Sequence, residues 1–210
     1  MPVPASAASN PDRWFALEEL AGSKVRLVPL AVEHAADYLA ALQVDGGAEQ
    51  VVQFLGRGPA AGTVEEARRE ILAALAARAR GERLPFAQFD RDSGDFIGTT
   101  SLYEVSPATR SLAIGYTWLG RRWWRTGHNN DSKLVLLTYA FETLQAARVV
   151  WHTDILNERS QAAIARLGAT REGVLRNHRI RADGTWRDSV QYSMTDADWP
   201  AVKDRLTAGH

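Results

Sequence analysis

The chain has 210 residues, of which 45% are hydrophobic, and this length and composition suit one globular domain with a sizeable core. Its 25 basic and 25 acidic residues cancel, so neither nucleic acid nor an anionic membrane is expected as a partner. The chain has no cysteine, which excludes a disulfide framework, zinc–thiolate sites and a cysteine nucleophile, and suits the reducing cytoplasm.

The N-terminal segment is rich in Ala, Ser and Pro, and it lacks the basic start and long apolar core of a signal peptide. We expect a disordered tail over residues 1–20 and a single domain over residues 21–210. No run of about 18 consecutive apolar residues occurs, so no membrane-spanning helix is predicted. The expected location is the cytoplasm.

The first part of the domain alternates between strand and helix signals. Residues 24–30 are rich in Val and Leu and predict a strand, and residues 32–43 predict a helix. A longer helical pattern follows Thr63, which has capping-box spacing to Glu66, and this pattern ends at Gly81.

Three strands are predicted next. Residues 84–90, residues 95–103 and Ser111–Leu119 are rich in β-branched and aromatic residues and are bounded by turn residues. The spacing predicts an antiparallel meander.

The second part begins with a polar loop, residues 120–127, that leads straight into an amphipathic helix. Residues 148–153 form a near-continuous apolar run, which predicts a strand covered on both faces, and residues 157–167 predict a helix. A hairpin of residues 171–181 and 190–194, followed by a short helix, ends the chain.

The basic loop is the first segment that indicates chemistry. A helix start leaves backbone N–H groups unpaired and carries partial positive charge, so a phosphate fits there. Arg121, Arg122 and Arg125 add charged donors, and Gly127 allows close approach because it has no Cβ. The loop therefore predicts a pyrophosphate site. The alternative is a solvated basic loop followed by an ordinary asparagine cap.

The second segment is the start of the next helix. Asn157 is suited to cap this helix, which places Ser160 one turn in, where its hydroxyl can give a proton to a leaving group. The alternative is a structural cap followed by a serine that a first helical turn tolerates.

In this order and at this spacing, the two segments resemble the GNAT acetyltransferase superfamily, and within it the Rim-type branch of ribosomal-protein-alanine N-acetyltransferases. The resemblance extends from Lys24 to about Trp199. Its strongest matches are Ile114-Gly115-Tyr116, residues 122–131, residues 157–160 and Leu167-Gly168-Ala169.

The resemblance implies an α/β (α+β) fold with a mixed, strongly twisted sheet and helices on both faces. Two central parallel strands, Ser111–Leu119 and Arg148–Asp154, would splay apart to admit acyl-CoA. The pantetheine amides would pair with the exposed edge of the first strand. The residues implied to bind CoA are Trp118, Leu119, Arg122, Arg125, Thr126, Gly127, His128, Asn129 and Asn157.

The implied reaction is transfer of an acetyl group from acetyl-CoA, a cosubstrate, to an amine by direct attack in a ternary complex. Backbone N–H groups near Trp118 would hold the developing oxyanion, and Ser160 would protonate the departing thiolate. No metal is required. Relatives in this family are often dimers, so a homodimer is expected from the resemblance.

Two positions depart from the family pattern. Arg125 replaces the first glycine of the phosphate loop. Ala113 and Arg179 stand near the places where relatives often carry a carboxylate that acts as general base. The remaining candidates for the base are Glu104, Glu172 and His178, and His178 has the unperturbed pKa closest to neutrality. A structural role for His178 is the alternative.

Without a carboxylate at these positions the general base is expected to be weak, and a weak base favours an α-amino group of a protein or peptide as the acceptor. At pH 7 roughly 10% of an α-amine is neutral, against well under ~0.1% of a lysine side chain. Transfer to a small amine such as a polyamine or aminoglycoside, or from a longer acyl donor, is the alternative within the enzymes. An acyl-CoA-binding regulatory module without turnover is the alternative from another class.

Four tryptophans have two interpretations. Aromatic side chains wall ligand pockets, but they also dominate cores and subunit contacts. The residues concerned are Trp123, Trp124, Trp151 and Trp186.

Overall fold

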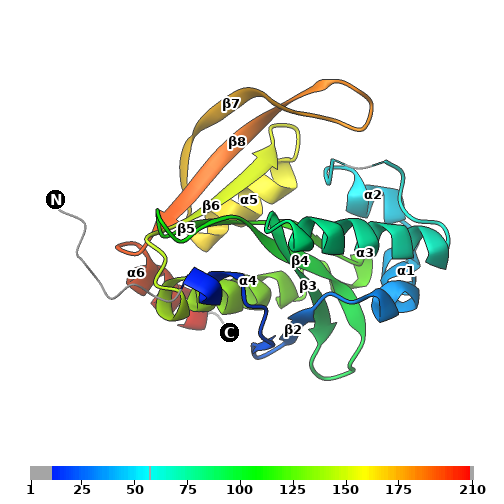
Figure 1. Ribbon diagram of the computed structural model, residues 1–210, viewed down its shortest axis with the longest axis horizontal. Coiled ribbons are helices and arrows are strands. Elements are labelled where there is room, and N and C mark those ends of the chain that lie inside the picture. Colours follow the sequence, from blue (N-terminus) through cyan, green and yellow to red (C-terminus); the bar gives the residue numbers. More distant parts are fainter. Residues whose placement is uncertain (1–10, 57, 209–210) are drawn as a thin grey trace.

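The protein is described by a computed structural model over residues 11–56 and 58–208 (Figure 1). One mixed sheet of eight strands forms its centre, in the order β1-β2-β3-β4-β5-β6-β8-β7. The strands are β1 (Leu20–Ala21), β2 (Val25–Pro29), β3 (Arg83–Asp90), β4 (Phe96–Ser106), β5 (Ser111–Leu119), β6 (Arg148–Asp154), β7 (Thr170–Ile180) and β8 (Trp186–Thr195). The predicted meander corresponds to β3, β4 and β5, and the predicted C-terminal hairpin to β7 and β8.

Helices cover both faces of the sheet, as predicted (Figure 1). One core cluster joins α1 (Ala35–Gln43), α2 (Ala48–Val52) and α3 (Val64–Ala79) to one face. A second cluster joins α4 (His128–Thr138), α5 (Glu158–Leu167) and α6 (Trp199–Ala208) to the other face. None of the helices in the described ranges is long and apolar enough to cross a membrane.

The capping box predicted for α3 is present. The Thr63 hydroxyl accepts from the Glu66 N–H at 3.2 Å, and the Glu66 carboxylate accepts from the Thr63 N–H at 3.2 Å. Two backbone donors at the start of the helix are thereby satisfied. Gly81 follows the end of α3 in the left-handed region, with φ of 74°.

The N-terminal region differs from the expected tail. Residues 1–10 lie outside the described residues, but Pro11–Phe15 form a 3₁₀ helix and Leu20–Ala21 pair with β2. The prediction of disorder was wrong for residues 11–20, because the Trp14 side chain is fully buried in the core on the α4 side. Burial of one large aromatic side chain stabilises this segment against the sheet.

The central parallel strands diverge. β5 and β6 pair only from Ser111 with Arg148 to Ala113 with Val150. Beyond these positions β5 stays paired with β4, and β6 stays paired with β8. Because β5 follows β4 and β6 follows β8, the facing backbone edges of β5 and β6 separate. This is the splayed arrangement that was predicted.

Asp131 ties the first turn of α4 to the start of β2. Its buried carboxylate accepts from the N–H groups of Ser23, Lys24 and Val25 at 3.0, 2.7 and 2.9 Å, and from the Ser23 hydroxyl at 2.9 Å. Burial alone would raise the pKa of Asp131, but these hydrogen bonds outweigh burial and lower it. The contact fixes the helix start relative to the sheet.

We expect Asp131→Asn to lower the free energy of unfolding at pH 7 by about 2–4 kcal/mol, because an amide offers weaker acceptance and places a donor against N–H groups. The carboxylate stabilises the fold above its unfolded pKa, so the difference from wild type should shrink as the pH falls below 3.8. Urea denaturation at several pH values measures both effects. Asp92→Asn, in an exposed turn, is the control, and an equal loss in that variant would contradict the prediction.

Candidate active site

A cleft of about 1520 Å³ opens where β5 and β6 separate. It exceeds the roughly 300–1,000 Å³ typical of a site for one small ligand, so there is room for two substrates. Its walls are residues 114–119 of β5, residues 151–153 of β6, the first turns of α4, α5 along its length, and side chains from α2, β4, β7 and β8.

The start of α4 forms one end of the cleft. Gly127 precedes the helix in the left-handed region, with φ of 91°, and no side chain caps the first turn. The cleft is lined there by Arg125, Gly127, Asn129 and Asn130. Uncapped N–H groups beside an arginine suit an anion, as the sequence predicted.

Arg125 adopts the left-handed conformation, with φ of 63°. An L-residue with a Cβ is strained there by about 1 kcal/mol, whereas glycine is not. This is the position at which the related family usually has glycine. The chain thus accepts backbone strain and gains a positive charge that lines the cleft.

Three residues predicted to bind CoA do not line the cleft: Arg122, Thr126 and His128. His128 is turned inward, with Nε2 at 2.7 Å from Asp90 Oδ1 and Nδ1 at 2.7 Å from Thr126 Oγ1. Arg122 lies over the ring of Trp123, at 5.6 Å from its centroid. The His128 and Thr126 side chains therefore hold the loop in shape, and only their backbone is left for a ligand.

The start of α5 forms the opposite wall. Asn157 Oδ1 accepts from the Ser160 N–H at 3.0 Å, which confirms the predicted cap. Ser160 is half-buried and lines the cleft, and its hydroxyl makes no hydrogen bond with the residues described here. Arg159 lies over the ring of Trp124 at 3.8 Å and links α5 to the loop before α4.

Trp118 follows a bulge in β5. Gly115 pairs with Ser101, but Trp118 pairs with Thr99, so β5 has one extra residue. Tyr116 lies within this bulge and has a left-handed backbone conformation, with φ of 51°. The Trp118 indole is buried against Tyr38, with ring centroids 4.8 Å apart, so its side chain is a core residue while its backbone stays on the separated edge.

Of the four tryptophans that were expected either to wall a pocket or to lie in the core or a subunit contact, three line the cleft. Trp123, Trp124 and Trp151 line the cleft, and Trp151 is also part of the core. Trp186 is 59% exposed at the β7–β8 hairpin.

Sequence reasoning missed a buried pair at the cleft, Tyr103 on β4 and His152 on β6. The Tyr103 hydroxyl lies 3.1 Å from His152 Nδ1, and His152 Nε2 lies 3.2 Å from Gln191 Oε1. An amide oxygen only accepts, so Nε2 carries the hydrogen and Nδ1 accepts from the tyrosine. Burial lowers the pKa of His152 and raises the pKa of Tyr103, so both are neutral at pH 7.

The three bases proposed from the sequence lie outside the cleft lining. His178 lies behind His152, with ring centroids 5.1 Å apart. Glu172 accepts from Arg148, Gln191 and Ser193, and the hydrogen bonds from Arg148 and then Gln191 lower its pKa to about 2. Glu104 is about half exposed and approaches His152 Nδ1 at 3.8 Å.

Lys133 on α4 is a second feature that the sequence did not indicate. Its amine is buried at the cleft and donates to Thr117 Oγ1 at 2.8 Å and to Thr100 Oγ1 at 3.2 Å. Burial lowers the pKa of Lys133 to about 7. Lys133 therefore connects α4 to β5 next to the bulge.

Residues 24–170 match the family described as "Acetyltransferase (GNAT) domain". Over 121 residues the chain is 28% identical to the ribosomal protein uS5-alanine N-acetyltransferase of Escherichia coli (strain K12), covering 57% of this chain and 61% of that enzyme. The chain thus matches less than two thirds of the length of this curated relative.

Two solved structures share the fold. A GCN5-related N-acetyltransferase from Brucella melitensis has a TM-score of 0.86 and 28% identity, covering 92% of this chain and 85% of that chain. Mycobacterium smegmatis RimJ, in complex with CoA-disulfide, has a TM-score of 0.71 and 24% identity, covering 92% and 93% of the two chains.

Two substitutions of Arg125 distinguish the effect of its charge on ligand affinity from the effect of its backbone strain on stability. Arg125→Gly and Arg125→Ala are both expected to weaken coenzyme A binding about tenfold, because a charge-assisted contact is lost. The glycine variant should be more stable than the alanine variant by about 1 kcal/mol, because only glycine relieves the left-handed strain. Isothermal calorimetry and thermal denaturation measure the two effects. Equal stability of the two variants would contradict the strain argument, and unchanged affinity would contradict the phosphate contact.

Proposed function

Because the chain belongs to the GNAT acetyltransferase family, we propose that it transfers an acetyl group from acetyl-CoA to the α-amino group of a protein or peptide. The observation that carries the proposal is the cleft between the diverging strands β5 and β6, which has a helix start on either side. It offers an anion site, an unpaired strand edge and a neutral proton acceptor in one space.

The residues at the helix starts suit acetyl-CoA. The uncapped turn of α4 with Arg125 and Gly127 would hold the pyrophosphate. The edge of β5 at Trp118 and Leu119 is not paired with β6. Its backbone groups can hydrogen-bond the amides of the pantetheine arm in the way that they would bind an added strand. Asn157 and Ser160 on α5 face this edge across the cleft.

The chemistry proposed for the cleft is direct transfer. The amine lone pair attacks the thioester carbonyl carbon, and backbone N–H groups at the β5 edge near Trp118 stabilise the developing oxyanion. As the carbon–sulfur bond breaks, the Ser160 hydroxyl gives its proton to the thiolate, and solvent water then returns a proton to the serine while the protonated base releases the amine proton to solvent. No group of the chain becomes acylated in this scheme.

The Tyr103–His152 pair replaces His178 as the proposed base. The Tyr103 oxygen would take a proton from the amine while its own proton passes to His152 Nδ1, 3.1 Å away. Gln191 holds the imidazole in the tautomer that accepts this proton. Because this base is weak, an acceptor amine with a pKa near ~8 is favoured over a lysine side chain.

A macromolecular acceptor is supported by the surface beside the cleft. Apolar side chains are exposed where the β6–α5 loop meets the β7–β8 hairpin, and exposed apolar groups of this kind mark sites of protein contact. They are Ile155, Leu156, Ile180 and Trp186. The E. coli relative is named for acetylation of a ribosomal protein alanine, which agrees with an α-amino acceptor.

The first test is thiol release from acetyl-CoA with peptides whose N-terminus is free or blocked. We expect release only with free N-termini, and mass spectrometry should place the acetyl group on the α-nitrogen. Ser160→Ala is expected to lower kcat by about 10²- to 10⁴-fold while coenzyme A still binds. Coenzyme A binding without release from any amine would instead favour a regulatory module.

The proposed relay has a signature in the pH profile. Acceptor kcat/KM should fall once as the amine is protonated and again as His152 is protonated, below pH 6.5 because burial lowers its pKa. We expect His152→Gln to lower the rate and to remove the second ionisation, and Tyr103→Phe to lower the rate because the relay is interrupted. A second ionisation that persists in His152→Gln would contradict the assignment.

A further inference from the structure

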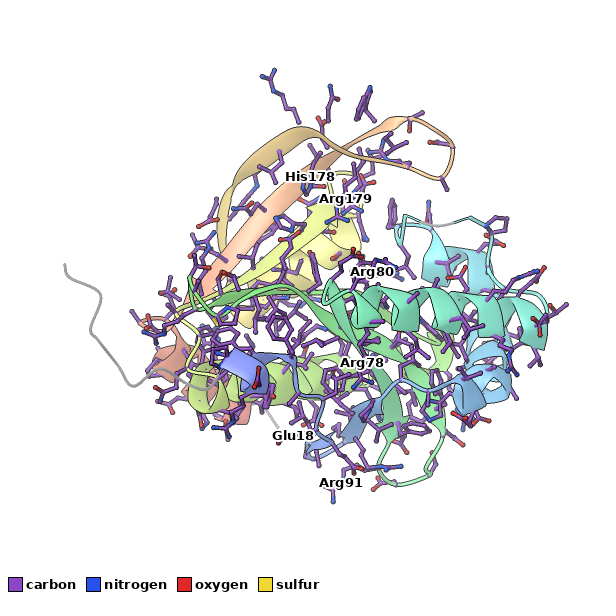
Figure 2. The ribbon with its side chains drawn as sticks, in the orientation of Figure 1. Glu18, Arg78, Arg80, Arg91, His178 and Arg179 are labelled. Atoms are coloured by element: carbon purple, nitrogen blue, oxygen red, sulfur yellow. The ribbon has the colours of Figure 1, made fainter. Side chains whose placement is uncertain are left out.

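Two arginines lie beside the proposed base. Arg179 on β7 lies opposite Arg187 on β8 in the register of the hairpin. Both side chains line the cleft. Figure 2 shows His178 and Arg179 between the β7–β8 hairpin and the body of the molecule. Arg187 Nη2 lies 3.5 Å from the carbonyl oxygen of His152, so its guanidinium group adjoins the base.

Arg187 is buried without a full set of partners. It is 9% exposed, and within the described part of the chain its Nε has no hydrogen-bond acceptor. The nearest carboxylate is that of Asp154, at 3.8 Å. A buried guanidinium group that lacks acceptors is costly, and an anionic ligand removes that cost.

Asp154 compensates Arg187 only in part, because the 3.8 Å contact is too long for a hydrogen bond and the carboxylate oxygens already accept from other donors. Arg181 donates to both of its oxygens, at 2.8 and 2.9 Å, and the Leu156 N–H donates to one of them at 2.9 Å. Arg179 has a contact of 3.5 Å with Glu104, which is about half exposed. Of the three arginines, Arg187 has the weakest carboxylate contact, because Asp154 lies at 3.8 Å from its Nε and at hydrogen-bond distance from Arg181.

These arginines are separate from the expected pyrophosphate site. On β6, Trp151 points into the core that α4 and α5 cover, and the neighbouring His152 points to the opposite face, as alternation along a strand requires. Arg187 adjoins His152, whereas Arg125 and Gly127 lie at the start of α4. The two positive regions are therefore suited to different ligands.

The wall of the cleft lacks compensating acids. Among its described lining residues only Glu158 carries a carboxylate, and Glu158 belongs to the first turn of α5. A single carboxylate among the described lining residues cannot balance the several charges of a polyamine or an aminoglycoside. The electrostatics favour an acceptor that brings its own negative charge.

We propose that Arg179 and Arg187 form a carboxylate subsite for the acceptor, so that the enzyme prefers an amine with a carboxylate close to it, such as a peptide N-terminus followed by Asp or Glu. The inference rests on the proposed function and names its substrate class. A guanidinium group binds a carboxylate through two parallel hydrogen bonds, which also orients the acceptor beside Tyr103 and His152. A free amino acid offers the same chemistry through its own carboxylate.

The test compares peptides that differ only in Glu, Gln or Lys at one of the first three positions, together with free amino acids. For wild type we expect kcat/KM to be about tenfold higher or more with Glu than with Gln, and lowest with Lys. Arg179→Gln and Arg187→Gln should lower kcat/KM for the Glu peptide more than for the Gln peptide, so that the preference for Glu is lost. Arg179→Glu should reverse the preference toward Lys.

Arg176→Gln is the matched control, because Arg176 lies on the same strand, is exposed and does not line the cleft. It should leave the preference unchanged. If Arg187→Gln does not fold, the charge reversal at Arg179, whose side chain is 37% exposed, still decides the question.

Equal kcat/KM for Glu and Gln peptides, or a Glu preference that survives Arg179→Glu, would overturn the subsite. Faster turnover of free amino acids that depends on Arg179 would support the subsite and identify the other source of the carboxylate. Failure of the proposed function is distinct, because then no acceptor would release thiol at all.

Discussion

The separation of β5 from β6 is the constraint on which the site depends. The strands are in register over only three residue pairs, because β5 remains bound to β4 and β6 to β8. Each strand then leads into a helix, so the starts of α4 and α5 face each other across the gap. A continuous parallel pair would satisfy both backbone edges and leave no room for a ligand.

The sheet divides the chemistry between its two faces. On the side of α4 and α5, uncapped N–H groups and Arg125 provide positive charge where an anion can bind. On the other face, Tyr103 and His152 are kept neutral by burial, beside the guanidinium groups of Arg179 and Arg187. A thioester held in the gap would thus meet its acceptor from the face that carries the proposed proton relay, Tyr103 and His152.

Much of this arrangement followed from local sequence signals. The Thr63–Glu66 and Asn157–Ser160 caps were predicted from spacing within one turn, and both hydrogen bonds are present. The loop that enters α4, the Gly127 turn, the β3–β4–β5 meander and the β7–β8 hairpin were also predicted from local signals. Such features depend on residues that are close in sequence, so pattern and propensity determine them.

Contacts over long sequence separations were decided only by the tertiary structure. Strand register brings Tyr103 to His152 across 49 residues, whereas the sequence had favoured His178. His128 turns toward Asp90, 38 residues away, and not into the cleft. Trp14 is buried although its segment looked disordered. The sequence alone determined which segments form strands, caps and the basic loop before α4, because those rest on local hydrogen bonds. The residues proposed as the base and as the carboxylate subsite came together only when packing placed distant side chains on one face of the sheet.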